Sequence, residues 1–80
     1  MTQEEILKQV NTIFIDILDS ENIVIKPGTT ANDIEEWDSL THIQLVVGIE
    51  KYFKIRFKSD EINSFKNVGE MCHAISVKIS

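Results

Sequence analysis

Cysteine, histidine, proline and glycine are all scarce in this chain of 80 residues. Cys72 is the only cysteine, which excludes an internal disulfide and fits a reducing compartment, so we expect a cytoplasmic protein. The histidines are His42 and His73 alone, and with a single cysteine they form no cluster typical of metal ligands. The sequence therefore predicts neither a disulfide scaffold nor a metal site.

Long apolar runs are absent as well. No run approaches the roughly 20 residues that a membrane-spanning helix needs. The first five residues, Met1–Glu5, are acidic, whereas a secretory signal begins with basic residues. We therefore expect no membrane span and no secretory signal.

Basic residues are outnumbered, 8 against 13 acidic ones, and the net charge of −5 disfavours general binding to nucleic acids. The imbalance is uneven along the chain. Residues 1–40 carry nine acids against Lys8 and Lys26, a net charge of −7. Residues 41–80 carry four acids against six bases, a net charge of +2, so the acidity lies in the first half.

The rest of the composition is that of a globular protein, with 42% hydrophobic and 26% charged residues. The length fits one small domain covering residues 1–80, which we expect to be monomeric. At typical values per residue, its free energy of unfolding is about 4–12 kcal/mol.

The first helix is predicted from Thr2–Glu5, which has the pattern of a capping box and is followed by apolar residues at helical spacing. A loop that extends to Trp37 follows, marked by Pro27-Gly28 and long for so small a domain. We expect one apolar stripe on the helix, formed by Ile6, Val10, Ile13 and Ile17 with Leu7, Phe14 and Leu18 beside them. We expect the loop to be pinned across the helices by Ile23, Ile25, Ile34 and Trp37.

The second helix is predicted over Ser39–Phe53, with apolar residues over so wide an arc that we expect burial on two sides. These apolar residues are Leu40, Ile43, Leu45, Val46, Val47, Ile49 and Phe53. The remaining narrow stripe, predicted to face solvent, consists of Thr41, Gln44, Gly48 and Lys51.

Two further helices complete the predicted fold. Ser59–Ile62 has the pattern of a short capped helix, and Asn67–Glu70 opens a last helix. The residues of the last helix that are expected to face inward are Val68, Met71, Cys72, Ile75 and Ile79. The short apolar runs 23–25 and 55–57 are interpreted as extended loop. The predicted fold class is all-α, a small four-helix bundle with three main helices, one short helix and a long first loop.

The tripeptide Asp38-Ser39-Leu40 places a serine where a polar loop gives way to an apolar helix. A hydroxyl there lies beside unpaired backbone N–H groups and the positive end of the helix dipole, a setting that favours a phosphate. In a simpler interpretation, Ser39 or Asp38 serves only as the N-cap of the helix.

The residues around this serine resemble the core motif of acyl carrier proteins. The resemblance covers nearly the whole chain: a helix, a long loop, Asp-Ser-Leu at the second helix, a short third helix and a last helix that opens at Asn67. The matching positions are Trp37, Asp38, Ser39 and Leu40, followed by Ile43, Leu45, Val46, Ile49, Glu50, Phe53 and Ile55.

The resemblance implies that Ser39 carries 4′-phosphopantetheine, transferred from coenzyme A by a separate magnesium-dependent phosphopantetheinyl transferase, with Asp38 and Leu40 flanking the attachment site. It further implies a carrier rather than an enzyme, which holds acyl groups as thioesters and delivers them to acyl-loading and acyl-transferring enzymes. A long flexible arm raises the local concentration of its cargo at the enzyme that binds the domain.

The sequence departs from the carriers of fatty acid synthesis on the exposed stripe of the second helix. In those carriers the stripe usually holds several acids that meet basic patches on partner enzymes. Here it has no acid, and a basic patch formed by Lys51, Lys54, Arg56 and Lys58 lies nearby. We therefore expect a specialised carrier outside standard fatty acid synthesis, with partners that contact Trp37, Thr41, Gln44, Gly48 and Lys51.

Other functions fit parts of the pattern. Peptidyl and aryl carriers commonly have Gly-Gly ahead of the serine, where this chain has Glu36-Trp37, which favours an acyl cargo. A helical interaction module without a prosthetic group would use Ser39 only as a cap. A serine hydrolase using Ser39 with His42 is disfavoured because the chain has no G-x-S-x-G elbow and no evident oxyanion hole.

Overall fold

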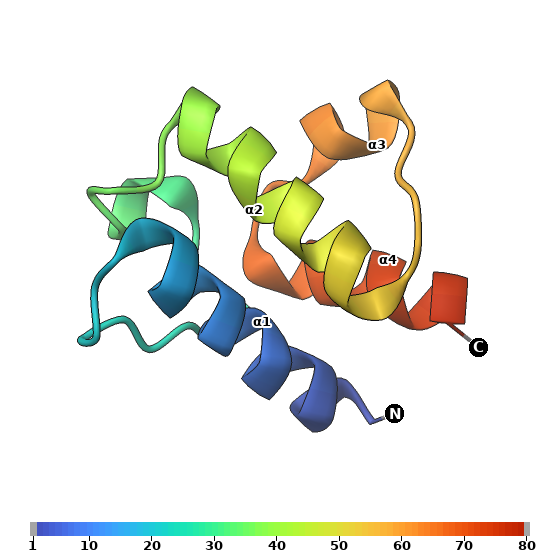
Figure 1. Ribbon diagram of the computed structural model, residues 1–80, viewed down its shortest axis with the longest axis horizontal. Coiled ribbons are helices and arrows are strands. Elements are labelled where there is room, and N and C mark those ends of the chain that lie inside the picture. The colour runs from blue at the N-terminus through green and yellow to red at the C-terminus, as the bar shows by residue number, and fades with distance from the viewer. Residues whose placement is uncertain (1, 80) are drawn as a thin grey trace.

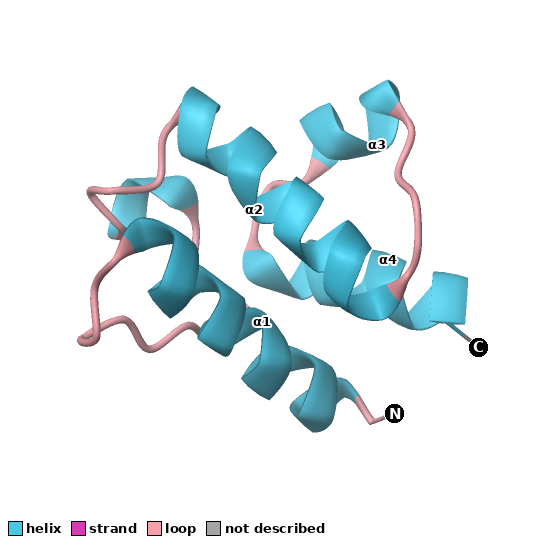
Figure 2. Ribbon diagram, viewed as in Figure 1, coloured by secondary structure: helices cyan, strands magenta, loops and turns pink. Residues whose placement is uncertain are grey.

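The computed structural model describes residues 2–79, and every regular element in that range is a helix (Figure 2). The all-α prediction, with three main helices and a short one, is therefore confirmed. None of the helices in residues 2–79 is long and apolar enough to cross a bilayer. The elements are α1 (Gln3–Leu18), the 3-10 helix η1 (Ala31–Asp33), α2 (Ser39–Phe53), α3 (Ser59–Ser64) and α4 (Val68–Ile79).

Helix α1 begins at the predicted capping box. The hydroxyl oxygen of Thr2 accepts from the Glu5 backbone N–H at 3.2 Å, and the Glu5 carboxylate accepts from the Thr2 N–H at 2.9 Å. The predicted apolar stripe is half right, because α1 packs against both α2 and α4 and so has two apolar rows. The fully enclosed row is Ile6, Val10, Phe14 and Leu18, while Ile13 and Ile17 are only half-buried and lie on the side of α2.

The three main helices enclose one core, with α1 in contact with both α2 and α4 (Figure 1). Helix α2 begins at the side of the molecule away from the start of α1 and the end of α4, and the short α3 stands apart beside it. The largest fully buried side chains are Phe14, Ile6, Leu45, Ile49, Met71 and Ile75. The inward face predicted for the last helix is confirmed, with Ile79 half-buried at its end.

The long loop between α1 and α2 is fastened at several points. Of its predicted anchors, Ile23, Ile25 and Trp37 are buried and Ile34 is half-buried. The Asn11 side chain accepts from the Ile25 N–H at 2.8 Å, which ties the loop to α1. The loop also contains η1, which the sequence analysis does not predict. The hydrogen bonds between Thr30 and Asp33 are local, so they leave no periodic pattern in the sequence.

The start of α4 is joined to the same loop through the backbone. Val68 N–H donates to the Thr29 carbonyl at 2.9 Å, and Gly69 N–H donates to the Pro27 carbonyl at 2.7 Å. These bonds satisfy N–H groups that have no partner within a helix. A Cβ atom at Gly69 would lie 2.9 Å from the Pro27 carbonyl oxygen, so the close approach requires glycine.

Helix α2 has the predicted bounds but not the predicted burial. Its enclosed residues are Leu45, Val46 and Ile49, whereas Leu40, Ile43 and Val47 are 70%, 48% and 41% exposed. The prediction of burial on two sides is therefore wrong for Leu40, Ile43 and Val47, which face solvent.

The prediction that Gly48 faces solvent is also wrong. Gly48 is half-buried against α1, where an added Cβ would lie 2.7 Å from Ile17 Cδ1 and 3.2 Å from Ile13 Cγ2. The glycine therefore lets α1 and α2 approach closely.

Candidate functional site

Asp38 is the N-cap of α2 and fixes where the helix begins. Its Oδ1 accepts from the Leu40 N–H at 3.0 Å and from the Thr41 N–H at 2.9 Å. The Thr41 hydroxyl oxygen in turn accepts from the Asp38 N–H at 2.7 Å, which completes a capping box. These bonds, from the Thr41 backbone first, lower the pKa of the Asp38 carboxyl below its usual 3.8. Asp38 is thus an anion at neutral pH, in the position that the helix dipole favours.

Ser39 is the first residue of α2 and is exposed to solvent. Of the two residues predicted as possible N-caps, Asp38 is the N-cap. The Ser39 hydroxyl is therefore not needed to cap the helix. Within residues 2–79 this hydroxyl makes no hydrogen bond. It is therefore accessible to another protein at a position that the capping box holds in place.

Behind Ser39, the side chains of Trp37 and His42 form a hydrogen-bonded pair. Trp37 Nε1 lies 3.1 Å from His42 Nδ1, and because an indole N–H only donates, His42 Nδ1 is the acceptor. His42 Nε2 then carries the proton and donates to the Ile62 carbonyl of α3 at 3.0 Å. The two rings are stacked with centroids 5.9 Å apart, and Phe14 meets Trp37 edge-on at 5.0 Å. The pair links α1, the loop, α2 and α3.

This pair also lines a hollow of about 640 Å³ beside Ser39. Its walls come from the end of the loop, the first turns of α2 and the segment around α3. The lining includes Trp37, Asp38, Ser39, His42, Ile43, Ile62 and Phe65. Sequence analysis did not place Ile62 or Phe65 here, because a helical pattern does not reveal which side of α2 the short α3 meets.

The arrangement does not suit the hydrolase alternative. Both ring nitrogens of His42 are committed, one to the Trp37 indole and the other to the Ile62 carbonyl. The imidazole is therefore not placed to take a proton from Ser39.

The sequence predicts no metal site. In the described residues, no group of three His, Cys, Asp or Glu side chains could hold a metal ion.

The residues predicted to contact partners fall into two groups. Gln44 and Lys51 are exposed on α2. Trp37 is predicted both to anchor the loop and to contact partners. It is only 6% exposed and anchors the loop. Thr41 is half-buried, and its hydroxyl donates to the Glu36 carbonyl at 2.9 Å. With Gly48 covered by α1, the predicted stripe is not continuous at the surface.

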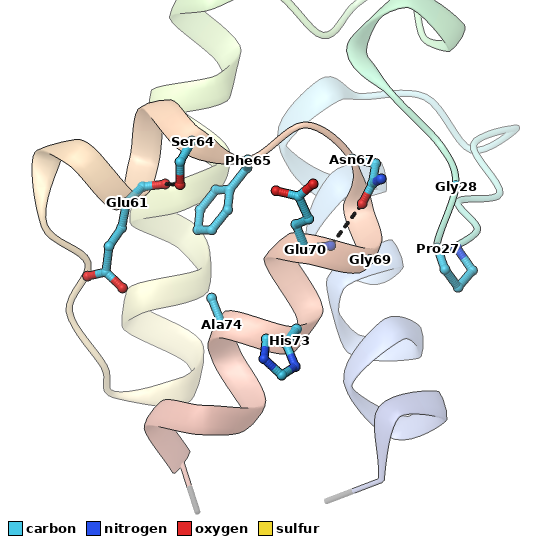
Figure 3. Close-up of a pocket in the computed structure, with 10 residues that line it drawn as sticks. All are labelled: Pro27, Gly28, Glu61, Ser64, Phe65, Asn67, Gly69, Glu70, His73 and Ala74. Carbon is cyan, nitrogen blue, oxygen red and sulfur yellow. Dashed lines mark hydrogen bonds between the residues drawn. The ribbon is translucent and has the colours of Figure 1, made fainter.

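A second hollow, of about 660 Å³, lies between α3, α4 and the loop near Pro27 (Figure 3). Apart from the exposed His73, the charged and amide side chains around it take part in the packing of the helices. Asn67 Oδ1 accepts from the Glu70 N–H at 2.9 Å, as the predicted cap of α4, and Glu61 pairs with Lys78 at 3.2 Å. We therefore assign the functional site to the hollow beside Ser39.

Comparison with known proteins identifies the family to which the chain is similar. A family model described as "Phosphopantetheine attachment site" matches residues 8–75, most of the chain. An acyl carrier protein from Guillardia theta is 32% identical over 81 residues, covering 100% of this chain and 99% of the relative. An acyl carrier protein from Acidothermus cellulolyticus is 29% identical over 70 residues, covering 88% and 83%.

A solved structure has the same fold. The solution structure of a holo acyl carrier protein from Geobacter metallireducens is 38% identical to this chain, with a TM-score of 0.86. The match covers 91% of this chain and 84% of that one.

Proposed function

Because the chain belongs to the acyl carrier protein family, we propose that the Ser39 hydroxyl oxygen is the atom that carries its 4′-phosphopantetheine. The protein is a carrier rather than an enzyme. When bound, the arm supplies a terminal thiol that holds acyl groups as thioesters. The observation that carries the proposal is an exposed Ser39 hydroxyl without an internal partner, at the capped start of α2.

The residues around Ser39 fit such a group. Asp38 holds the helix start in place without using the serine hydroxyl. Asp38 also occupies the N–H groups of Leu40 and Thr41, so the helix dipole rather than those N–H groups would favour the phosphate. Leu40 lies next to Ser39 and is 70% exposed, so an enzyme that approaches the serine can contact it.

The proposal includes the partners that a carrier needs. A phosphopantetheinyl transferase would attach the arm from coenzyme A, and acyl-loading and acyl-transferring enzymes would use it. We place the protein in the cytoplasm as a monomer, in keeping with its single, buried and free Cys72. The exposed Gln44 and Lys51, without an acid on the predicted stripe, support a specialised carrier outside standard fatty acid synthesis.

The attachment site is tested by incubating the protein with coenzyme A, magnesium and a phosphopantetheinyl transferase of broad carrier range, followed by intact-mass measurement. The wild type is expected to gain the mass of one phosphopantetheine, and Ser39→Ala is expected to gain none. Ser59→Ala is the matched control, because Ser59 is likewise the exposed first residue of a helix, α3. It is expected to be modified like the wild type.

Full modification of Ser39→Ala would contradict the assignment of the site. A folded wild type that gains no mass with an active transferase would contradict the proposed function itself. Circular dichroism of Ser39→Ala checks the fold, which should survive because Asp38 remains as the cap.

A further inference from the structure

Three cations gather at the far end of α2 from Ser39. Lys51, Lys54 and Arg56 line a hollow of about 600 Å³ together with Val47, Glu50 and Ile55. All three basic side chains are exposed, and the apolar part of the hollow comes from Val47, 41% exposed, and the half-buried Ile55.

None of these three cations forms an ion pair within residues 2–79. The one acid in the hollow, Glu50, uses its Oε2 to accept from the Phe57 N–H at 2.8 Å. The ion pair found within residues 2–79 joins Lys78 to Glu61, which lie elsewhere. Lys51, Lys54 and Arg56 are therefore available to anionic groups of another molecule.

The hollow continues into an apolar row that leads to Ser39. Leu40, Ile43 and Val47 are exposed by 70%, 48% and 41%, and their spacing places them along one side of α2. With a helical rise of about 1.5 Å per residue, Lys51 lies about 18 Å along the axis from Ser39. A partner that receives the arm at Ser39 can thus contact the cations at the same time.

We propose that this basic-apolar face, formed by Leu40, Ile43, Val47, Lys51, Lys54 and Arg56, binds acyl-transferring enzymes through an acidic patch on the enzyme. The inference rests on the proposed function and names its partner class: an enzyme surface with Asp and Glu side chains about 18 Å from the entrance to its active site. Apolar contacts near Ser39 and charge pairs near Lys51 then fix the orientation of the carrier.

The charge distribution supports an acidic partner. The whole chain has a net charge of −5, and residues 1–40 account for −7. An acidic surface attracts the Lys51 end of the basic-apolar face and is repelled by the acids of residues 1–40, including Asp38 beside Ser39, which favours one orientation at encounter. A basic surface, as on enzymes that bind acidic carriers, meets like charges at this face.

The test uses acylated holo protein, with its arm verified by mass, and a fatty acid ketosynthase that has a basic carrier-docking patch. The ketosynthase is used as it is and in a form whose docking Lys and Arg residues are replaced by Glu. The carriers are the wild type, Lys51→Glu/Arg56→Glu, and the control Lys8→Glu/Lys26→Glu. Both variants undergo the same change in net charge, but Lys8 and Lys26 are exposed residues that do not line this hollow.

With the charge-reversed enzyme at low salt, we expect kcat/KM for Lys51→Glu/Arg56→Glu to fall about tenfold below the wild type, and the control to fall much less. With the unmodified basic enzyme, the same double variant is expected to exceed the wild type. Both differences should shrink at about 1 M salt, where the Debye length is about 3 Å.

Several outcomes would overturn the inference. Equal effects of the two double variants would show that net charge acts rather than this face, and no effect of Lys51→Glu/Arg56→Glu would show that the face is not used. Binding of the wild type, but not of this variant, to phosphatidylglycerol vesicles would assign the face to a lipid surface. In each case a fully loaded Ser39 leaves the proposed function intact, whereas failure to load Ser39 removes both.

Discussion

At the scale of single residues, Cys72 differs from the thiol that a carrier presents to its enzymes. Its side chain is 3% exposed, and this burial raises the pKa of the Cys72 thiol to about 11, from a usual value of 9.0. The folded protein therefore keeps the thiol neutral at pH values where the unfolded chain has begun to ionise it. Cys72 thus acts as a small apolar core residue, as its spacing with Val68 and Ile75 predicts.

This pKa has a direct consequence for stability at high pH. Between about pH 9 and pH 11 the folded state binds more protons at Cys72 than the unfolded state does, so the free energy of unfolding falls as pH rises through this window. We expect Cys72→Ala to lack this component of the decrease. Denaturant unfolding of both proteins at pH 8, 9, 10 and 11 measures it, and parallel pH profiles would contradict the assignment.

At the scale of elements, His42 connects the start of α2 to α3. Helix α3 has only six residues and no buried side chain, so it depends on contacts such as the one from His42 Nε2 to the Ile62 carbonyl. We expect His42→Ala to accelerate amide hydrogen exchange in α3 and of the Trp37 indole proton. His73→Ala, at an exposed position on α4, is the control and should leave both unchanged. Unaltered exchange in His42→Ala would mean that α3 is held by other contacts.

The elements also show what could be predicted from the sequence. The bounds of α2 and the caps of α1 and α4 follow from local patterns, because Asp38, Thr2 and Asn67 act within three residues of their partners. The exposure of Ile43 and the covering of Gly48 could not be predicted, since they depend on which neighbour reaches each side of α2. An apolar face offered to a partner has the same sequence pattern as one buried in the core.

For the whole molecule, the free energy of unfolding of about 4–12 kcal/mol is small, and a few buried side chains supply much of it. Phe14 is completely buried and meets Trp37 edge-on at 5.0 Å. We expect Phe14→Ala to cost about 3–5 kcal/mol, enough to unfold part of the population. Phe53→Ala is the comparison, because Phe53 lies half-buried at the end of α2 and should cost less. Denaturant melts that rank the two variants in the opposite order would contradict this description of the core.

The two backbone bonds between the long loop and α4 have a kinetic consequence. They join Pro27 and Thr29 to Gly69 and Val68, so forming them closes a loop that contains all of α2 and α3. The entropy lost in such a closure is compensated only when the enclosed helices have packed, which places these bonds late in folding. In reverse, an excursion that releases the first turn of α4 removes two anchors from the loop that leads to Asp38, which is then held by the Asn11 bond and its own buried side chains. Helix α4 thus contributes to the rigidity of the loop that ends beside Ser39.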